Sequence, residues 1–329
     1  MLTKKENLLE TIHGGHPDRY VKQFEVFHLL MNTPDKLATT PVIQGAPPVK
    51  NRWGVTLGWP EGTPGFFPVH DAEHIVVKDI QHWREYVKAP SARFPSGMYE
   101  ACLKEIEEMD GEEEMATLHL LAGFFEQCHY LCEITNALTY FYTEPESMQD
   151  LIAYLLDWEM EFADEYCTKI KPDAILHHDD WGTQISSFIS PEMFEEFFLE
   201  PYKQLYGFYK SKNILIVHHA DCYCANLVPY MIEMGIDIWQ GAMSTNNIPE
   251  LLRKYGGQIS IMGGIDNGLV DRVDWTPENI LNVTRKTCRE CGKGYYIPCT
   301  TVGRNTSAYP GVYEAVGDAI EQVNREMWP

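Results

Sequence analysis

Short apolar runs alternate with stretches of helical periodicity through the C-terminal two thirds of the chain. The runs that predict buried strands cover residues 117–123, 172–177, 214–217, 236–240, 258–262 and 294–299. Between these runs, apolar side chains recur three and four positions apart, as they do in amphipathic helices. Short strands that alternate with such helices are typical of parallel βα units. We therefore predict an α/β protein with a single (β/α)8 TIM barrel, of which at least six units follow residue 117.

No predicted strand is followed by the glycine-rich loop of a nucleotide site, which favours the barrel over an open doubly wound sheet. The whole chain, residues 1–329, is predicted to be one domain. About residues 1–115 form an N-terminal extension of helices and a pocket loop, and about residues 116–329 form the recognisable βα units. The loop, residues 40–70, is rich in glycine and proline and contains Trp53. Aromatic side chains in such loops often line a pocket, although Trp53 could equally attach the loop to the barrel.

The composition excludes several classes of partner. The net charge is −22, from 26 basic and 48 acidic residues, and no basic run is present. Nucleic acids and anionic membranes are therefore not expected as partners. No apolar stretch approaches the roughly 20 residues of a membrane span, and the polar N-terminus is unlike a signal peptide. The nine cysteines are scattered, so we expect reduced thiols in a cytoplasmic protein.

The segment 214–224 concentrates chemistry where a predicted strand passes into a helix. After the apolar run come two histidines, an aspartate and two cysteines: His218, His219, Asp221, Cys222 and Cys224. In α/β folds the carboxyl ends of strands are where ligands bind. A thiol at the start of the following helix is expected to ionise readily. The alternative is a buried histidine with two ordinary core cysteines.

If the sheet closes, the ends of several strands meet at one mouth. They carry His177, His178, Asp179, Asp180, His218, His219, Asp221, Cys222, Cys224, Gln240, Asp266 and Cys299. A histidine with two cysteines is a known ligand set of catalytic zinc, so we predict zinc held by His219, Cys222 and Cys299. Asp221 is the rival for the position of Cys222. Thiolate and imidazole ligands disfavour magnesium and calcium.

The remaining candidates are acids and substrate-binding groups. Asp179, Asp180 and Asp221 are catalytic candidates, since neighbouring carboxylates in a buried pocket acquire different pKa values. Adjacent residues of a strand point to opposite faces, so only one of Asp179 and Asp180 should enter the site; the alternative role is to cap a helix or loop. The predicted substrate-binding residues are Trp53, His178, Trp181, Gln240 and Asp266.

Several tracts resemble one known family. They are Asp179-Asp-Trp-Gly-Thr-Gln184, Ser190-Pro-Glu-Met-Phe-Glu-Glu-Phe-Phe-Leu-Glu-Pro-Tyr202, the His219 segment, Gly235-Ile-Asp, Gly263-Gly-Ile-Asp266 and the turn at Cys299. Over about residues 115–325 the chain is similar to the uroporphyrinogen decarboxylase superfamily. That resemblance implies a single (β/α)8 barrel, in agreement with the periodicity.

Two branches of this family differ in chemistry. The true decarboxylases bind a porphyrinogen with eight carboxylates through an N-terminal arginine-rich motif, which is not visible here. The cobalamin-dependent methyltransferases hold zinc with a His-x-Cys pair and a later cysteine. His219 and Cys299 match that pattern, whereas Asp221 occupies the middle place and Cys222 follows one residue later.

The resemblance therefore implies a methyltransferase that moves a methyl group between a small substrate and the cobalt of a corrinoid on a separate shuttle protein. Asn51-Arg-Trp-Gly-Val, with Pro64-Gly65 and Pro68, is similar to members associated with O-demethylation of methoxylated, possibly aromatic, compounds. No Asp-x-His-x-x-Gly cobalamin signature is found in the chain. The direction of transfer stays open, and the alternatives are a decarboxylase of another substrate and a non-catalytic metal- or ligand-binding barrel.

Overall fold

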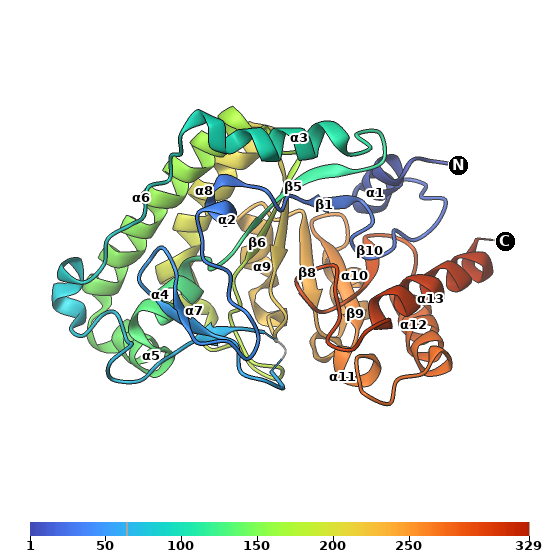
Figure 1. Ribbon diagram of the computed structural model, residues 1–329. Coiled ribbons are helices and arrows are strands. Elements are labelled where there is room, and N and C mark those ends of the chain that lie inside the picture. Colours follow the sequence, from blue (N-terminus) through green and yellow to red (C-terminus); the bar gives the residue numbers. More distant parts are fainter. Residues whose placement is uncertain (64, 329) are drawn as a thin grey trace.

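The computed structural model describes residues 1–63 and 65–328, so Pro64 of the predicted pocket loop lies outside the described residues. Seven parallel strands form a curled sheet in the order β1-β5-β6-β7-β8-β9-β10 (Figure 1). Their bounds are β1 (Phe27–Leu29), β5 (Met115–Leu120), β6 (Ala174–His178), β7 (Leu215–His219), β8 (Ile238–Ala242), β9 (Ser260–Ile265) and β10 (Tyr296–Thr300). The predicted α/β barrel fold is confirmed, and the six strands from β5 onward are the six predicted units.

The sheet has seven strands in the described residues, where the ideal barrel has eight. Among the residues described, no strand ladder joins β10 to β1, and a backbone hydrogen bond crosses from Gln23 N to Pro298 O at 3.2 Å. Alternate residues of the strands fill the interior with a single apolar cluster. From β6 to β10 its members are Ala174, Leu176, Val217, Ile238, Met262, Ile297 and Cys299. Because successive side chains of a strand alternate between faces, the next inward positions are His178, His219 and Gln240.

Helices cover the outside of the sheet. They are α1 (Lys4–His13), α2 (Pro34–Leu37), α3 (Glu100–Glu108), α4 (Phe124–Cys132), α5 (Ile134–Thr143), α6 (Pro145–Lys169), α7 (Pro191–Phe194), α8 (Glu200–Ser211), α9 (Val228–Glu233), α10 (Ile248–Tyr255), α11 (Asn267–Val270), α12 (Pro277–Cys291) and α13 (Val312–Met327). A π-helical segment, Glu195–Leu199, joins α7 to α8. Short 3-10 segments are Ile80–Glu85, Ser96–Tyr99, Ala225–Leu227 and Ser244–Asn246. No helix of the described residues is long and apolar enough to cross a membrane.

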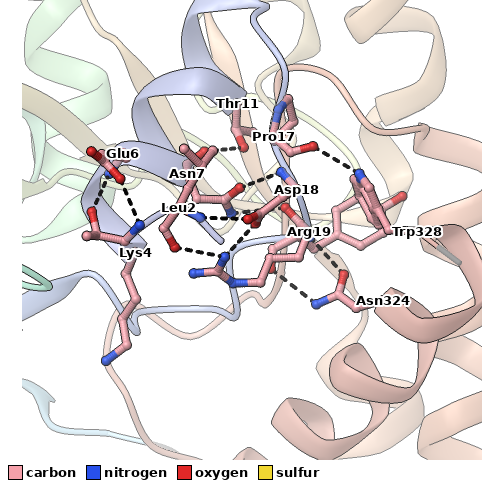
Figure 2. A network of polar contacts seen from close by, with 12 residues as sticks. Leu2, Lys4, Glu6, Asn7, Thr11, Pro17, Asp18, Arg19, Asn324 and Trp328 are labelled. Atoms are coloured by element: carbon pink, nitrogen blue, oxygen red, sulfur yellow. Dashed lines mark hydrogen bonds and ion pairs between the residues drawn. The ribbon is translucent and has the colours of Figure 1, made fainter.

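The amino-terminal ends of the strands are covered by α1, which buries Leu8 and Ile12 in the barrel interior cluster. Figure 2 shows the polar contacts that tie this region to the C-terminal helix. Asn7 Oδ1 accepts from Asp18 N at 3.0 Å, and the indole of Trp328 donates to Pro17 O at 2.9 Å. Polar contacts therefore tie α1 and the segment after it to the end of the chain.

The glycine- and proline-rich region, predicted as a loop, contains a small antiparallel sheet. Its strands are β2 (Val49–Lys50), β3 (Thr56–Gly58) and β4 (Phe67–Pro68). Two- and three-residue strands are too short to show the alternating pattern from which strands are predicted. The tract is therefore more ordered than its composition indicates.

Candidate functional site at the carboxyl ends of the strands

Two neighbouring strands bring His178 and His219 together at the barrel mouth. Parallel pairing sets His178 opposite His219, and His219 opposite Gln240 on the next strand. The two imidazole rings stack with centroids 4.3 Å apart and 28° between their planes. The His219 side chain is 1% exposed and that of His178 is 22% exposed, so the pair lies just below the surface of the mouth.

Asp180 completes a group with these two rings. Its Oδ2 lies 3.8 Å from His178 Nε2, and its Oδ1 lies 3.9 Å from His219 Nε2. The same Oδ1 accepts a hydrogen bond from the backbone N–H of Asp221 at 2.8 Å, which fixes the carboxylate. The two histidines and Asp180 could hold a metal ion, because their ligand atoms all lie within 4.8 Å of one another. Among the histidine, cysteine, aspartate and glutamate side chains of residues 1–63 and 65–328, this is the group found with that geometry.

The far nitrogen of each ring has its own polar partner. His178 Nδ1 lies 2.7 Å from Glu126 Oε2, and His219 Nδ1 is hydrogen-bonded to Gln240 Oε1. Gln240 was predicted from its position at a strand end, whereas Glu126 was not predicted; it lies in the first turn of α4, shortly after β5. The signal was available, because Glu126 follows a strand end just as Asp180 does.

The His219 ring is also confined by backbone. A Cβ added at Gly241, where φ is +89°, or at Gly303 would lie 2.9 Å from His219 Cε1. Side chains at either position would displace the ring, since nonbonded carbon atoms pack at about 3.5–4.0 Å. The two glycines therefore let the chain close tightly around one imidazole.

The electrostatic environment shifts the pKa values of the two imidazole rings in opposite directions. Burial alone would lower the pKa of His178, but the carboxylates of Glu126 and Asp180 raise it to about 10. Burial, together with the charge of His178, lowers the pKa of His219 to about 4. Burial and the negative charge of Asp180 raise the pKa of Asp221 well above its ordinary range. Near neutral pH the mouth thus combines an imidazolium with a neutral imidazole.

Asp179 points to the other side of the strand from Asp180. Its carboxylate accepts from the backbone N–H groups of Phe125 and Glu126 at 3.0 and 2.7 Å, at the start of α4. It also accepts from the Trp181 indole at 2.9 Å and from the Tyr202 hydroxyl. Asp179 is therefore a buried cap of α4, the alternative that the sequence left open.

Trp181 lies on the same outer side. It is fully buried and stacks on His218, with ring centroids 4.2 Å apart.

The predicted cysteine ligands lie outside the His178–Asp180–His219 group. Cys222 Sγ lies 3.2 Å from Cys224 Sγ, and both thiols are buried. The turn that carries them is held by Asn246, which accepts from Cys224 N at 2.8 Å and donates to Cys222 O at 3.0 Å. The expectation that Cys222 ionises readily is wrong, because burial raises its pKa well above the ordinary value. Cys299 belongs to the interior apolar cluster, and burial raises its pKa as well.

Two further predicted residues lie around the rim of the barrel. Trp53 packs edge-on against Trp158 of α6, with ring centroids 5.1 Å apart. Together with Leu121 and Gly123 these tryptophans line a cavity of about 20 Å³, room for one water molecule. Asp266 follows β9, where it accepts from Gly268 N at 2.9 Å and Ser244 Oγ at 2.9 Å.

Several solved structures are similar to this chain to different degrees. A methyltransferase from Methanosarcina mazei superimposes with a TM-score of 0.69 over 100% of both chains, at 12% sequence identity. An endo-β-1,4-mannanase double mutant from Cellulomonas fimi gives 0.45 at 12% identity, over 96% of this chain and 74% of that one. A sugar phosphate isomerase/epimerase from Parabacteroides distasonis gives 0.36 at 10% identity, over 70% of this chain and 76% of that one. The search of curated proteins finds no match.

At 12% identity the likeness to the Methanosarcina mazei methyltransferase shows a shared fold. The family model is more specific, because the one described as uroporphyrinogen decarboxylase (URO-D) matches residues 49–319, a span that includes every strand from β2 to β10 and the whole mouth. The chain therefore belongs to the uroporphyrinogen decarboxylase (URO-D) family.

Proposed function

We propose that this protein is a methyltransferase that moves a methyl group between a small substrate and the cobalt of a corrinoid carried by a separate protein. The likeness in fold to the Methanosarcina mazei methyltransferase over the full length of both chains supports this choice within the family. The observation that carries the proposal is the group of His178, Asp180 and His219 at the mouth, with Glu126 behind it. The proposed substrate is a methoxylated, possibly aromatic, compound.

The main obstacle in demethylating such an ether is the leaving oxygen, because phenolate and alkoxide leave poorly. His178, held protonated by Glu126 and Asp180, would donate a proton to that oxygen as a general acid. A corrinoid docked at the mouth would supply cobalt(I) as the nucleophile for the methyl group, and the oxygen would leave with the proton from His178. In the reverse use, with a thiol as acceptor, the neutral His219 would accept the proton of the thiol.

A separate carrier needs a surface to bind at the mouth. Apolar side chains are exposed just after the carboxyl ends of three strands: Leu121 after β5, Ile185 after β6, and Leu269 and Val273 after β9. Exposed apolar groups around a mouth are typical of a protein-docking surface. A carrier that docks there could bring its cobalt towards His178 and Asp180.

The test is a methyl-transfer assay with the purified chain, a reduced corrinoid shuttle protein and a panel of methoxylated aromatics, followed by the cobalt absorption spectrum. Methyl-cobalt should appear only when all three components are present, and His178→Gln should slow its formation by about 10²–10⁴-fold. Release of carbon dioxide without corrinoid would instead identify a decarboxylase. A protein that binds compounds of the panel without turnover would be a binding barrel.

A further inference from the structure

The two mouth histidines present the same ring nitrogen to one carboxylate. Their Nδ1 atoms are occupied by Glu126 and Gln240, which leaves both Nε2 atoms directed at Asp180. The separations of 3.8 and 3.9 Å are too long for hydrogen bonds. Zinc ligands lie about 2.0–2.2 Å from the ion, so two ligands of one ion can be at most about 4.4 Å apart. Both separations fit this limit.

Gln240 fixes which nitrogen of His219 is free. Its Nε2 donates to Val302 O at 3.1 Å, so the amide oxygen must face the imidazole. An amide oxygen only accepts, and His219 Nδ1 therefore carries the proton, while Nε2 keeps its lone pair. The Gly241 and Gly303 contacts hold the ring in this orientation. Histidines that ligate metals typically have their other ring nitrogen held in this way by a carboxylate or carbonyl group.

We propose that His178 Nε2, His219 Nε2 and the Asp180 carboxylate bind a zinc ion, with Glu126 and Gln240 as positioning residues. Two imidazoles and one carboxylate form a known catalytic zinc set, which leaves a coordination position open for a substrate atom. The inference rests on the proposed function, because the ion would polarise the leaving oxygen at the same mouth. With zinc at Nε2, His178 would keep only its Nδ1 proton towards Glu126, so polarisation by the ion would take the place of proton donation by His178.

This ligand set differs from the His219, Cys222 and Cys299 set expected from the sequence. Cys222 is turned towards Cys224, with the sulfur atoms 3.2 Å apart, and neither Cys222 nor Cys299 belongs to the group of possible ligands. In the described part of the chain, the possible metal ligands that lie close together are thus two imidazole nitrogens and a carboxylate oxygen. Such a set accepts zinc or cobalt(II) without any thiolate.

The test is metal binding by the full-length protein after removal of bound metal, measured by calorimetric titration with zinc and by the absorption of the cobalt(II) form. We expect one ion per chain and no thiolate-to-cobalt charge-transfer band. Asp180→Asn should abolish tight zinc binding. The substitution keeps the shape of the side chain, and the position is partly exposed. Gln240→Met should weaken binding by about 10–100-fold, as expected for a residue that orients a ligand.

Cys222→Ser and Cys299→Ser separate the two ligand sets, and His218→Gln is the matched histidine control on the outer side of β7. All three should keep one ion per chain. A charge-transfer band, loss of the ion in either cysteine variant, or a wild-type protein that binds no zinc would overturn the proposal. None of these measurements uses corrinoid or a methyl donor. A protein that binds zinc through Asp180 yet transfers no methyl group would therefore contradict the proposed function alone.

Discussion

The two faces of β6 and β7 carry the same residue types in different environments. His177 and His218 are paired in the ladder directly beside the pair His178 and His219. The outer pair lies against helix α8, where the Tyr206 hydroxyl contacts His177 Nδ1 at 3.1 Å and His218 Nδ1 at 2.7 Å. The inner pair lies at the mouth, where each ring has its own acceptor and both face Asp180.

The environment sets the chemical state of each ring. Burial lowers the pKa of His177 to about 3 and that of His218 well below its ordinary value, so both outer rings are neutral. Their Nε2 atoms are buried without a hydrogen-bond partner. The inner rings have pKa values of about 10 and 4, pushed apart by nearby carboxylates and by burial. Paired groups with separated pKa values are typical of acid–base sites, whereas the outer pair packs the sheet against α8.

The largest expected effects come from removing each of two adjacent carboxylates, Asp180 and Asp179, in separate variants. Asp180→Ala should reduce methyl transfer by about 10²–10⁴-fold, as for loss of a group that supports general acid catalysis, with little change in melting temperature. Asp179→Ala should instead lower the free energy of unfolding by about 3 kcal/mol or more, because four buried donors lose a charged acceptor. Methyl-transfer rates and denaturant titrations measure the two effects. Equal losses of stability in both variants would contradict the division between the two faces.

The sequence predicted much of this architecture. Apolar runs located all six strands from β5 to β10, with ends shifted by a few residues. For example, the strand predicted at residues 236–240 is found at Ile238–Ala242. There the ladder shifts register between Gln240 and Ala242, an irregularity around Gly241 that periodicity cannot reveal. The tract from Val49 to Pro68 was predicted as a loop because its strands are very short.

The site residues stay predictions, but their neighbourhood can be compared. The strand ends predicted a shared mouth, and His178, Asp180, His219 and Gln240 lie beside one another in the structure. Successive residues of a strand point to opposite faces, so only one histidine of each adjacent pair faces the mouth. Two identical neighbours do not reveal which one it is. Glu126 also follows a strand end, but it was not predicted because it lies within the first turn of a helix rather than on the strand.

A second prediction tests whether the buried Glu159, on helix α6 outside the sheet, carries a charge in the folded protein. Glu159 of α6 is buried, and burial, followed by the charge of Asp179, raises its pKa to about 8 from an ordinary 4.5. Because the folded-state pKa is the higher one, the stability that protonated Glu159 contributes is fully present below about pH 4.5 and is lost as pH rises through about 8. Glu159→Gln should therefore exceed the wild type in stability at pH 9 by up to about 5 kcal/mol, since each pKa unit corresponds to about 1.4 kcal/mol.

The measurement is the difference in unfolding free energy between variant and wild type at pH 9 and at pH 5. The difference should fall to below about 1 kcal/mol at pH 5, where Glu159 is protonated in the folded protein and only partly ionised in the unfolded one. Asp157→Asn, an exposed position two residues earlier on the same helix, is the control and should show no such dependence. A gap of equal size at both pH values would mean that Glu159 is ionised in the folded protein throughout.

The smallest effect concerns the hydroxyl shared by the outer histidines. Tyr206→Phe would leave two buried ring nitrogens without their partner, at a cost of about 1–3 kcal/mol. Zinc binding and methyl transfer should stay at wild-type levels, because the mouth histidines have other partners. Tyr209→Phe provides a matched control on the same helix, since the Tyr209 hydroxyl is buried without a hydrogen bond. Removing that hydroxyl should be neutral or slightly stabilising in a denaturant titration. If Tyr206→Phe instead left stability unchanged but weakened zinc binding, the outer pair would act on the mouth, and the two faces of these strands would not be independent.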